Sequence, residues 1–150
     1  MKISDILTER LVKTGLESTD KDGLFREMIQ LFVDQGLLNS GEEALAALRD
    51  RESKMTTGIA NGLALPHGKL RGAKGLMMAL GVSQAGIEYE SLDGEPVHVV
   101  IMVLAEAGSP GPHIEALAEI SRLFALPRFM NRIREAQSTK EVLDLIRREE

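Results

Sequence analysis

The sequence contains no cysteine and no tryptophan, and aromatic side chains make up only 3% of its 150 residues. The lack of cysteine excludes disulfide bonds, thiol catalysis and thiolate metal sites. The shortage of aromatic rings argues against a surface that binds nucleic acid by base stacking. The core must therefore be built from aliphatic side chains and the seven methionines.

A secretion signal, a membrane-spanning apolar run and an excess of positive charge are also lacking. Residues 1–7 have neither the apolar core nor the cleavage site of a signal peptide, and no apolar run reaches membrane-spanning length. The net charge of -5 argues against general binding to phosphate backbones. We therefore expect one globular domain over residues 1–150, located in the cytoplasm, with no membrane insertion and no nucleic-acid partner.

Two helices are predicted in the first third of the chain. Helical spacing and a capping residue predict a helix that begins at residue 19 or 20 and ends at Gly36. A second helix is predicted from Ser40, whose hydroxyl caps it, to residue 49 or 51. Arg51 then follows the second helix.

Several stretches have the composition of β-strands. An edge strand is predicted over residues 10–16, and residues 76–82 form an apolar run between glycines. Residues 87–92 continue toward an Asp-Gly turn. Residues 96–104 are rich in β-branched side chains and almost wholly apolar, which predicts the central strand of a sheet. A further strand, ahead of a loop at residues 69–74, is predicted to be anchored by Ile59, Leu63 and Leu65.

Three helices are predicted near the C-terminus. The first begins at His113 and has an apolar stripe made of Ile114, Leu117, Ile120 or Ser121, and Phe124. The second opens at Pro127 and ends near residue 136. The third is capped by Ser138 and Thr139 and buries Val142, Leu145 and Ile146. Helices before, between and after strands predict an α/β fold in which helices cover a sheet.

A glycine-punctuated segment, residues 58–69, is predicted to present His67 on a turn. Pro66 fixes the backbone before the histidine, and Gly68 leaves the backbone after it free. Imidazole is both a nucleophile and a leaving group near neutral pH, so His67 can hold a phosphoryl group transiently. The alternative is a loop histidine with no chemical role.

Three other side chains are candidates for the same chemistry. His113 lies at a predicted helix N-terminus, where free N–H groups favour an anion, and Arg51 has the forked guanidinium that binds phosphate oxygens. Asn61 is either a polar clamp or a turn residue. Taken singly, His113 is equally explained as a surface or capping residue, and Arg51 as a surface charge. His98, inside an apolar strand, is interpreted as structural.

The sequence motifs of common metal and cofactor sites are missing. The three histidines show no paired spacing for a metal ion. There is also no Walker loop, no nucleophile elbow and no dinucleotide fingerprint. We therefore expect no metal and no cofactor.

One long segment resembles a known active-site region. It begins at Arg51, ends at His67 and reads RESKMTTGIANGLALPH, which is similar to the enzyme IIA domains of the bacterial phosphotransferase system, in the fructose/mannitol and nitrogen-regulatory class. The similarity covers essentially the whole chain, because the preceding helices, the strand at residues 97–104 and the Pro-His-Ile helix start also match. It implies a single domain with a mixed β-sheet sandwiched between helices on both faces.

The resemblance also implies a function. His67 would accept a phosphoryl group from a histidine phosphocarrier protein (HPr or its nitrogen-branch equivalent), for transfer to an enzyme IIB domain or for signalling to regulated proteins. Arg51 and the backbone of Gly111 to Ile114 would stabilise the phosphoryl group, and His113 would orient or stabilise it. The second ring nitrogen of His67 would be held by a backbone carbonyl or an equivalent acceptor. With no transporter fused to the chain, we expect the nitrogen-regulatory type. The alternatives are a stand-alone fructose/mannitol component and a non-catalytic interaction domain.

Overall fold

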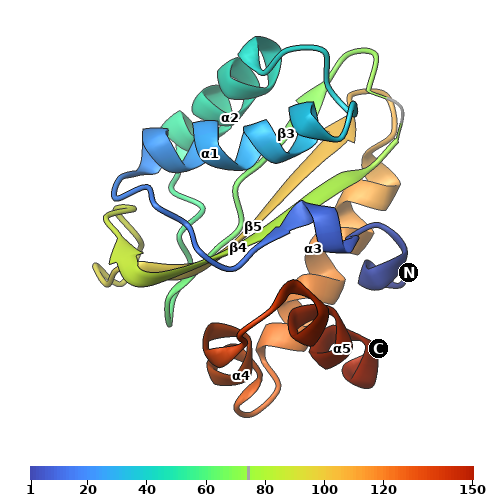
Figure 1. The fold of residues 1–150 in the computed structure, drawn as a ribbon. Helices are drawn as coiled ribbons and strands as arrows, with labels where there is room; N and C mark the ends of the chain where they lie inside the picture. The colour runs from blue at the N-terminus through green and yellow to red at the C-terminus, as the bar shows by residue number, and fades with distance from the viewer. Residues whose placement is uncertain (74) are drawn as a thin grey trace.

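A mixed β-sheet forms the centre of the molecule, and helices cover both of its faces (Figure 1). The structure is a computed structural model that describes residues 1–73 and 75–150. This architecture confirms the predicted α/β fold. In chain order the elements are η1 (Ile3–Asp5), η2 (Glu9–Leu11), β1 (Val12–Lys13), α1 (Lys21–Asp34), α2 (Glu42–Lys54), β2 (Leu63–Ala64), β3 (His67–Leu70), β4 (Met77–Ile87), β5 (Val97–Glu106), α3 (Pro110–Phe124), α4 (Phe129–Glu135) and α5 (Thr139–Glu149).

The strand order is β1-β4-β5-β2, and β3 continues along β5 after β2. β5 is antiparallel to β4 and parallel to both β2 and β3, with Leu63 opposite Val99 and His67 opposite Val103. Nearly every side chain of β5 is buried, so the predicted central strand is confirmed. β4 is longer than predicted and contains a register shift between Val82 and Ile87. The predicted edge strand shrinks to the two residues of β1.

The labelled helices divide between the two faces of the sheet (Figure 1). α1 packs on β4 and α2 on β3, whereas α3, α4 and α5 cover the opposite face. The Asp20 side chain accepts the Gly23 N–H at 2.8 Å, and the Ser138 hydroxyl accepts the Glu141 N–H at 3.1 Å, so these two predicted caps are confirmed. Thr139, also predicted as a cap, is the first residue of α5. As predicted, α5 buries Val142, Leu145 and Ile146. No helix in the described ranges 1–73 and 75–150 is long and apolar enough to cross a membrane.

α2 differs from its prediction at both ends. Its N-cap is Gly41, with no side-chain cap, so the predicted Ser40 cap is wrong. A Cβ on Gly41 would lie only 2.6 Å from Ile29 Cγ2, which shows how closely the start of α2 packs on α1. The helix continues to Lys54, which places Arg51 in its last turn rather than after it. The run of charged, good helix formers sustains this extra turn.

The turn predicted around His67 is wrong, because His67 is the first residue of β3. Gly68 serves another purpose than a turn: a Cβ there would lie 3.2 Å from Ala47 Cβ, so its absence lets α2 approach the sheet. Because β3 continues to Leu70, the loop predicted at residues 69–74 begins two residues later than predicted. Lys74 lies outside the described residues. Among the predicted anchors, Leu63 and Leu65 are buried but Ile59 is exposed.

α3 begins at Pro110 and presents the predicted face only in part: Ile120 is buried, and Leu117 and Phe124 are partly buried against the core. Its buried residues are His113, Ala116, Ile120 and Leu123. Ile114 is 65% exposed, so the predicted apolar stripe is wrong there. The helix turns a polar ring inward in place of an isoleucine, which is typical of functional sites. α4 begins at Phe129 rather than at Pro127, after Arg128 adopts a left-handed conformation with φ 66°.

Candidate functional site

Three elements bring Arg51, His67 and His113 together. Arg51 comes from the last turn of α2, His67 from the start of β3 and His113 from the first turns of α3. The Arg51 Nε lies 3.2 Å from His67 Nε2. The two imidazole rings are 5.1 Å apart between centroids, with their planes tilted by 58°. The three side chains that the sequence singled out for phosphate chemistry thus form one cluster.

Hydrogen bonds assign the two ring nitrogens of His67 to different roles. Nδ1 lies 2.7 Å from the carbonyl oxygen of Leu65, which can only accept, so Nδ1 carries the proton. Nε2 then holds the lone pair and accepts the Arg51 Nε–H. Arg51 is itself oriented by a second bond, from its Nη1 to the Met55 carbonyl at 2.9 Å. The half-buried ring is therefore fixed with Nε2 as its basic atom.

The pKa values of both histidines lie below the usual histidine range. Burial is the main cause for His67, and the charges of Arg51 and Lys69 also lower its pKa, while the Leu65 carbonyl and Glu52 act in the opposite direction. Burial again dominates for His113, reinforced by His67, Lys69 and Arg51. Both rings are therefore neutral near pH 7, and a neutral imidazole is the form that can act as a nucleophile.

His113 is buried, with 6% exposure, and its Nδ1 has no hydrogen-bond partner among the described residues. It lies at the start of a helix whose N-cap, Ser109, makes no side-chain cap. Pro110 and Pro112 have no N–H, so the backbone of Gly111 supplies the free donor of the described first turn. This end of α3 therefore offers a donor and a partial positive charge to an anion.

The other predicted binding residues lie outside this cluster or at its rim. Asn61 is in a left-handed turn, with φ 58° and its N–H bonded to Asp93 Oδ2 at 3.1 Å. The carbonyl of Gly62, the residue after Asn61, accepts the His98 N–H, whereas His67 lies opposite Val103 on the same strand, β5. At about 3.3 Å per residue along β5, the backbone of Asn61 is therefore roughly 16 Å from that of His67. This position agrees with the turn interpretation of Asn61 and separates its backbone from the cluster of Arg51, His67 and His113.

Ile114 and His98 also differ in position from the three central residues. The Ile114 side chain is exposed on α3 beside His113, so it lies at the rim of the site. His98 Nδ1 lies 2.9 Å from the carbonyl oxygen of Ser83 on the neighbouring strand, in agreement with a structural histidine.

Sequence reasoning missed a group of polar residues behind Arg51. The Glu52 carboxylate accepts the Thr57 N–H at 2.8 Å and the Thr57 hydroxyl at 2.7 Å, and pairs with Lys21 Nζ at 3.1 Å. The Thr57 hydroxyl is also 2.7 Å from the Tyr89 hydroxyl. The available signal was the position of Glu52 directly after Arg51. Lys69 was missed too, although side chains two residues apart on a strand share a face with each other.

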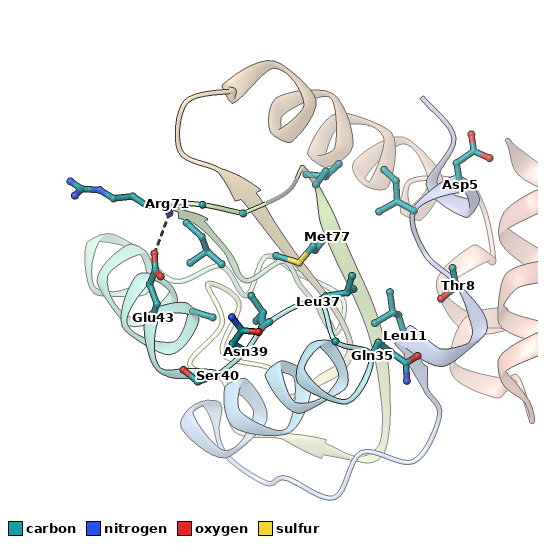
Figure 2. Close-up of a pocket in the computed structure, with 18 residues that line it drawn as sticks. Asp5, Thr8, Leu11, Gln35, Leu37, Asn39, Ser40, Glu43, Arg71 and Met77 are labelled. Carbon is teal, nitrogen blue, oxygen red and sulfur yellow. Dashed lines mark hydrogen bonds between the residues drawn. The ribbon is translucent and has the colours of Figure 1, made fainter.

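A pocket of about 710 Å³ lies away from the histidines. Its lining comes from residues 5–11, 35–44, 70–73 and 76–77, and Figure 2 shows Glu43 at its edge, where the carboxylate accepts the Arg71 N–H at 3.1 Å. Arg51, His67 and His113 do not line it. Among the described residues no cluster of three or more acidic or histidine side chains is placed to hold a metal ion. The histidine cluster is therefore the candidate site.

Comparisons with known proteins identify similar chains. The model of the family described as "Phosphoenolpyruvate-dependent sugar phosphotransferase system, EIIA 2" matches residues 5–149. A "PTS system fructose-specific EIIABC component" of Bacillus subtilis is 36% identical over 97% of this chain, which spans 23% of that protein's length. A "Nitrogen regulatory protein" of Bradyrhizobium diazoefficiens is 30% identical over 97% of this chain and 96% of its own.

A solved structure agrees with these relatives. The nitrogen regulatory protein IIA-Ntr of Neisseria meningitidis superposes with a TM-score of 0.89, at 26% identity, over 96% of this chain and 98% of its own. The likeness extends over nearly the whole described fold.

Proposed function

This chain belongs to the EIIA 2 family of the phosphoenolpyruvate-dependent sugar phosphotransferase system, and from that premise we propose that it carries a phosphoryl group on His67. The observation that carries the proposal is the hydrogen bond between His67 Nδ1 and the Leu65 carbonyl. This bond leaves the lone pair on Nε2, and the lowered pKa keeps it unprotonated near pH 7. His67 is therefore prepared as a nucleophile.

The transfer step exchanges one nitrogen–phosphorus bond for another. The Nε2 lone pair attacks the phosphorus of a phosphohistidine on the donor protein, and the donor's N–P bond breaks as its electron pair returns to the donor ring. The phosphorylated ring of His67 keeps its Nδ1 proton, and the Leu65 carbonyl stabilises the resulting positive charge. The reaction needs no other reactant, so positioning and charge stabilisation are the protein's main contributions.

Arg51 and His113 supply the charge stabilisation in this proposal. The Arg51 Nε–H occupies Nε2 in the resting site, at 3.2 Å, so this bond must open before Nε2 can attack. The released guanidinium then binds the phosphoryl oxygens with its forked N–H groups. Neutral His113 and the Gly111 N–H donate to the same oxygens from the other side of the site.

The proposed donor is a histidine phosphocarrier protein that docks at the rim of the site. Two large apolar side chains are exposed at this rim: Met55, whose carbonyl anchors Arg51, is 58% exposed, and Ile114 is 65% exposed. Such side chains bury apolar area when a partner protein docks around a polar centre. In this proposal Ile114 contacts the donor protein through its side chain, which is a different role from the backbone contact with the phosphoryl group predicted from the sequence.

We propose the nitrogen-regulatory role first, in which the phosphorylation state itself is the output. The names of the relatives from Bradyrhizobium diazoefficiens and Neisseria meningitidis support it. The second candidate is the fructose or mannitol transport role, in which His67 passes its phosphoryl group to an enzyme IIB domain. The 36% identity to the fructose-specific protein of Bacillus subtilis favours that role.

The test is phosphorylation in a reconstituted system. The protein is incubated with phosphoenolpyruvate, enzyme I and a histidine phosphocarrier protein, and its intact mass is measured. We expect an acid-labile gain of one phosphoryl group that is lost in His67→Ala and kept in His98→Gln, the matched control on a structural histidine. No gain with several phosphocarrier proteins would contradict the proposal and favour a non-catalytic interaction domain.

A further inference from the structure

We propose that Glu52 is a positioning residue, which holds His67 in its reactive tautomer through Thr57 and Leu65. The inference deepens the proposed function, on which it rests, because it concerns how the same histidine is prepared. It assigns a role to a buried carboxylate that touches neither the phosphoryl group nor the imidazole.

The Glu52 carboxylate is enclosed and fully engaged. Its side chain is only 7% exposed, and it receives three donors: the Thr57 N–H, the Thr57 hydroxyl and the Lys21 ammonium. An ionised carboxylate accepts at both oxygens, which matches this set of donors. Burial of such a group is tolerated only when it is paired and hydrogen-bonded, as it is here. The segment that contains Thr57 is therefore tied firmly to the last turn of α2.

A continuous series of hydrogen bonds leads from Glu52 to His67. Thr57, held by Glu52 at its N–H and hydroxyl, uses its carbonyl to accept the Leu65 N–H at 3.0 Å. The Leu65 carbonyl then accepts the Nδ1–H of His67 at 2.7 Å. Arg51, the residue before Glu52, contacts the other ring nitrogen directly. Two consecutive residues of α2 thus control both nitrogens of one imidazole.

Tyr89 and Lys21 support this series from the other side. Because the Thr57 hydroxyl donates to Glu52, the fully buried Tyr89 hydroxyl donates to Thr57, at 2.7 Å. Lys21 Nζ lies 4.7 Å from the centre of the Tyr89 ring. A Cβ on Gly58 would lie 2.8 Å from Tyr89 Cδ1, so this glycine permits the close packing of the segment on Tyr89. Packing and hydrogen bonds together hold Thr57 in place.

Glu52→Gln separates positioning from overall shape. Glutamine has the same size, but it turns one acceptor oxygen into an NH2 group that faces a donor of Thr57 or Lys21. The Thr57 carbonyl, and with it the Leu65 carbonyl, then loses its fixed position. We expect a larger share of His67 with the proton on Nε2, which cannot attack, and transfer from the phosphocarrier slowed about 10- to 100-fold at unchanged KM.

Two matched comparisons keep the test specific: Glu27→Gln is the control for Glu52→Gln, and Thr57→Ser is the control for Thr57→Val. Glu27→Gln alters a carboxylate with similar contacts, remote from His67, and should leave the His67 tautomer and the transfer rate unchanged. Thr57→Ser keeps the hydroxyl and should behave as wild type, whereas Thr57→Val loses it and should reproduce the effect of Glu52→Gln. The Thr57 pair also decides the matter if Glu52→Gln does not fold.

The readout is nitrogen NMR of His67 over a pH series, recorded on the unphosphorylated protein. Burial, Arg51 and Lys69 lower the pKa of His67, whereas the Leu65 carbonyl and Glu52 raise it, so Glu52→Gln should lower this pKa further. A wild-type tautomer ratio and transfer rate in both Glu52→Gln and Thr57→Val would overturn the inference. A wild-type protein that is never phosphorylated would instead overturn the proposed function, while the NMR result would still decide the role of Glu52.

Discussion

Glu27 and Glu52 make similar contacts in two different regions of the molecule. Glu27, on α1, accepts the N–H groups of Glu17 and Ser18 at 3.0 Å each and the Ser18 hydroxyl at 2.6 Å, and it pairs with Lys13 Nζ at 2.9 Å. Glu52 likewise accepts a backbone N–H, the hydroxyl of the same residue and a lysine. Each carboxylate therefore fastens a short segment of chain to a helix.

The two regions differ in what the fastened segment contacts next. Glu27 holds the segment between β1 and α1, which contributes to the edge of the sheet. Glu52 holds Thr57, whose carbonyl leads through Leu65 to His67. The same contact chemistry thus stabilises the fold in one place and prepares an imidazole in the other. A role in the site follows from the path of contacts, not from the carboxylate's own partners.

The largest expected effect concerns Arg51, directly beside Glu52. Arg51→Ala should slow phosphoryl transfer about 100- to 1000-fold, the usual cost of removing one donor to a developing charge, while unfolding stability changes little. Arg49→Ala is the matched control, because Arg49 lies in the same helix but pairs with Asp22 at 2.7 Å. Rapid-quench measurement of phosphoryl transfer from the phosphorylated carrier gives the rates of both variants. A wild-type transfer rate in Arg51→Ala would contradict a role in phosphoryl transfer for the region around Glu52.

The next effect concerns stability at Glu27. Burial alone would raise the pKa of Glu27, but hydrogen bonds from Lys13, Ser18 and the backbone lower it to about 2, from 4.5. The ionised form is therefore favoured in the folded protein. Its stabilisation is complete above pH 4.5 and is lost as the pH falls from 4.5 toward 2.

Glu27→Gln should thus lower the free energy of unfolding at pH 7 by about 1–3 kcal/mol, the cost of leaving partly buried donors unsatisfied. It should also flatten the acid dependence between pH 4.5 and 2. Denaturant unfolding at a series of pH values measures both. Slower phosphoryl transfer in Glu27→Gln, at temperatures where it is folded, would contradict the separation between the two regions.

Local sequence signals predicted the fold where one physical cause dominates. The β-branched run of β5 can only be buried on both faces, and the caps Asp20 and Ser138 satisfy N–H groups within their own helices. His67 was misplaced on a turn because Gly68 has two physical uses, and only the packed α2 shows that close approach is the one that applies. On α3, Ile114 was wrongly assigned to the buried face, because hydrophobic periodicity does not register a buried histidine.

The site itself was less accessible to local reasoning. Arg51 and His113 are far from His67 in the sequence, and only the resemblance to a known family predicted that all three act together. Glu52 and Tyr89 were not found at all: the position of Glu52 directly after Arg51 was the one local signal, and it indicates neither burial nor partners. Their contacts depend on how α2, the segment at Thr57 and the end of β4 pack, which is a property of the tertiary structure.

The smallest expected effect tests charge alone, at Lys69. Lys69 lowers the pKa of both His67 and His113, together with Arg51, while Glu52 opposes it at His67. Lys69→Gln should therefore raise both pKa values slightly, without changing the tautomer that the Leu65 carbonyl sets. Because only unprotonated His67 can attack, the acid limb of the transfer rate should move to higher pH by the same amount.

NMR titration of the ring signals in Lys69→Gln measures this shift, with Lys140→Gln as the control, because Lys140 pairs with Asp144 on α5, at 2.7 Å. A change in the His67 tautomer in Lys69→Gln would mean that charge, rather than the series of hydrogen bonds from Glu52, determines which ring nitrogen carries the proton. An unchanged titration would mean that Lys69 does not act on the site. Charge at Lys69 and geometry at Glu52 can therefore be told apart on the same histidine, because the first moves a pKa and the second moves a proton between two nitrogens.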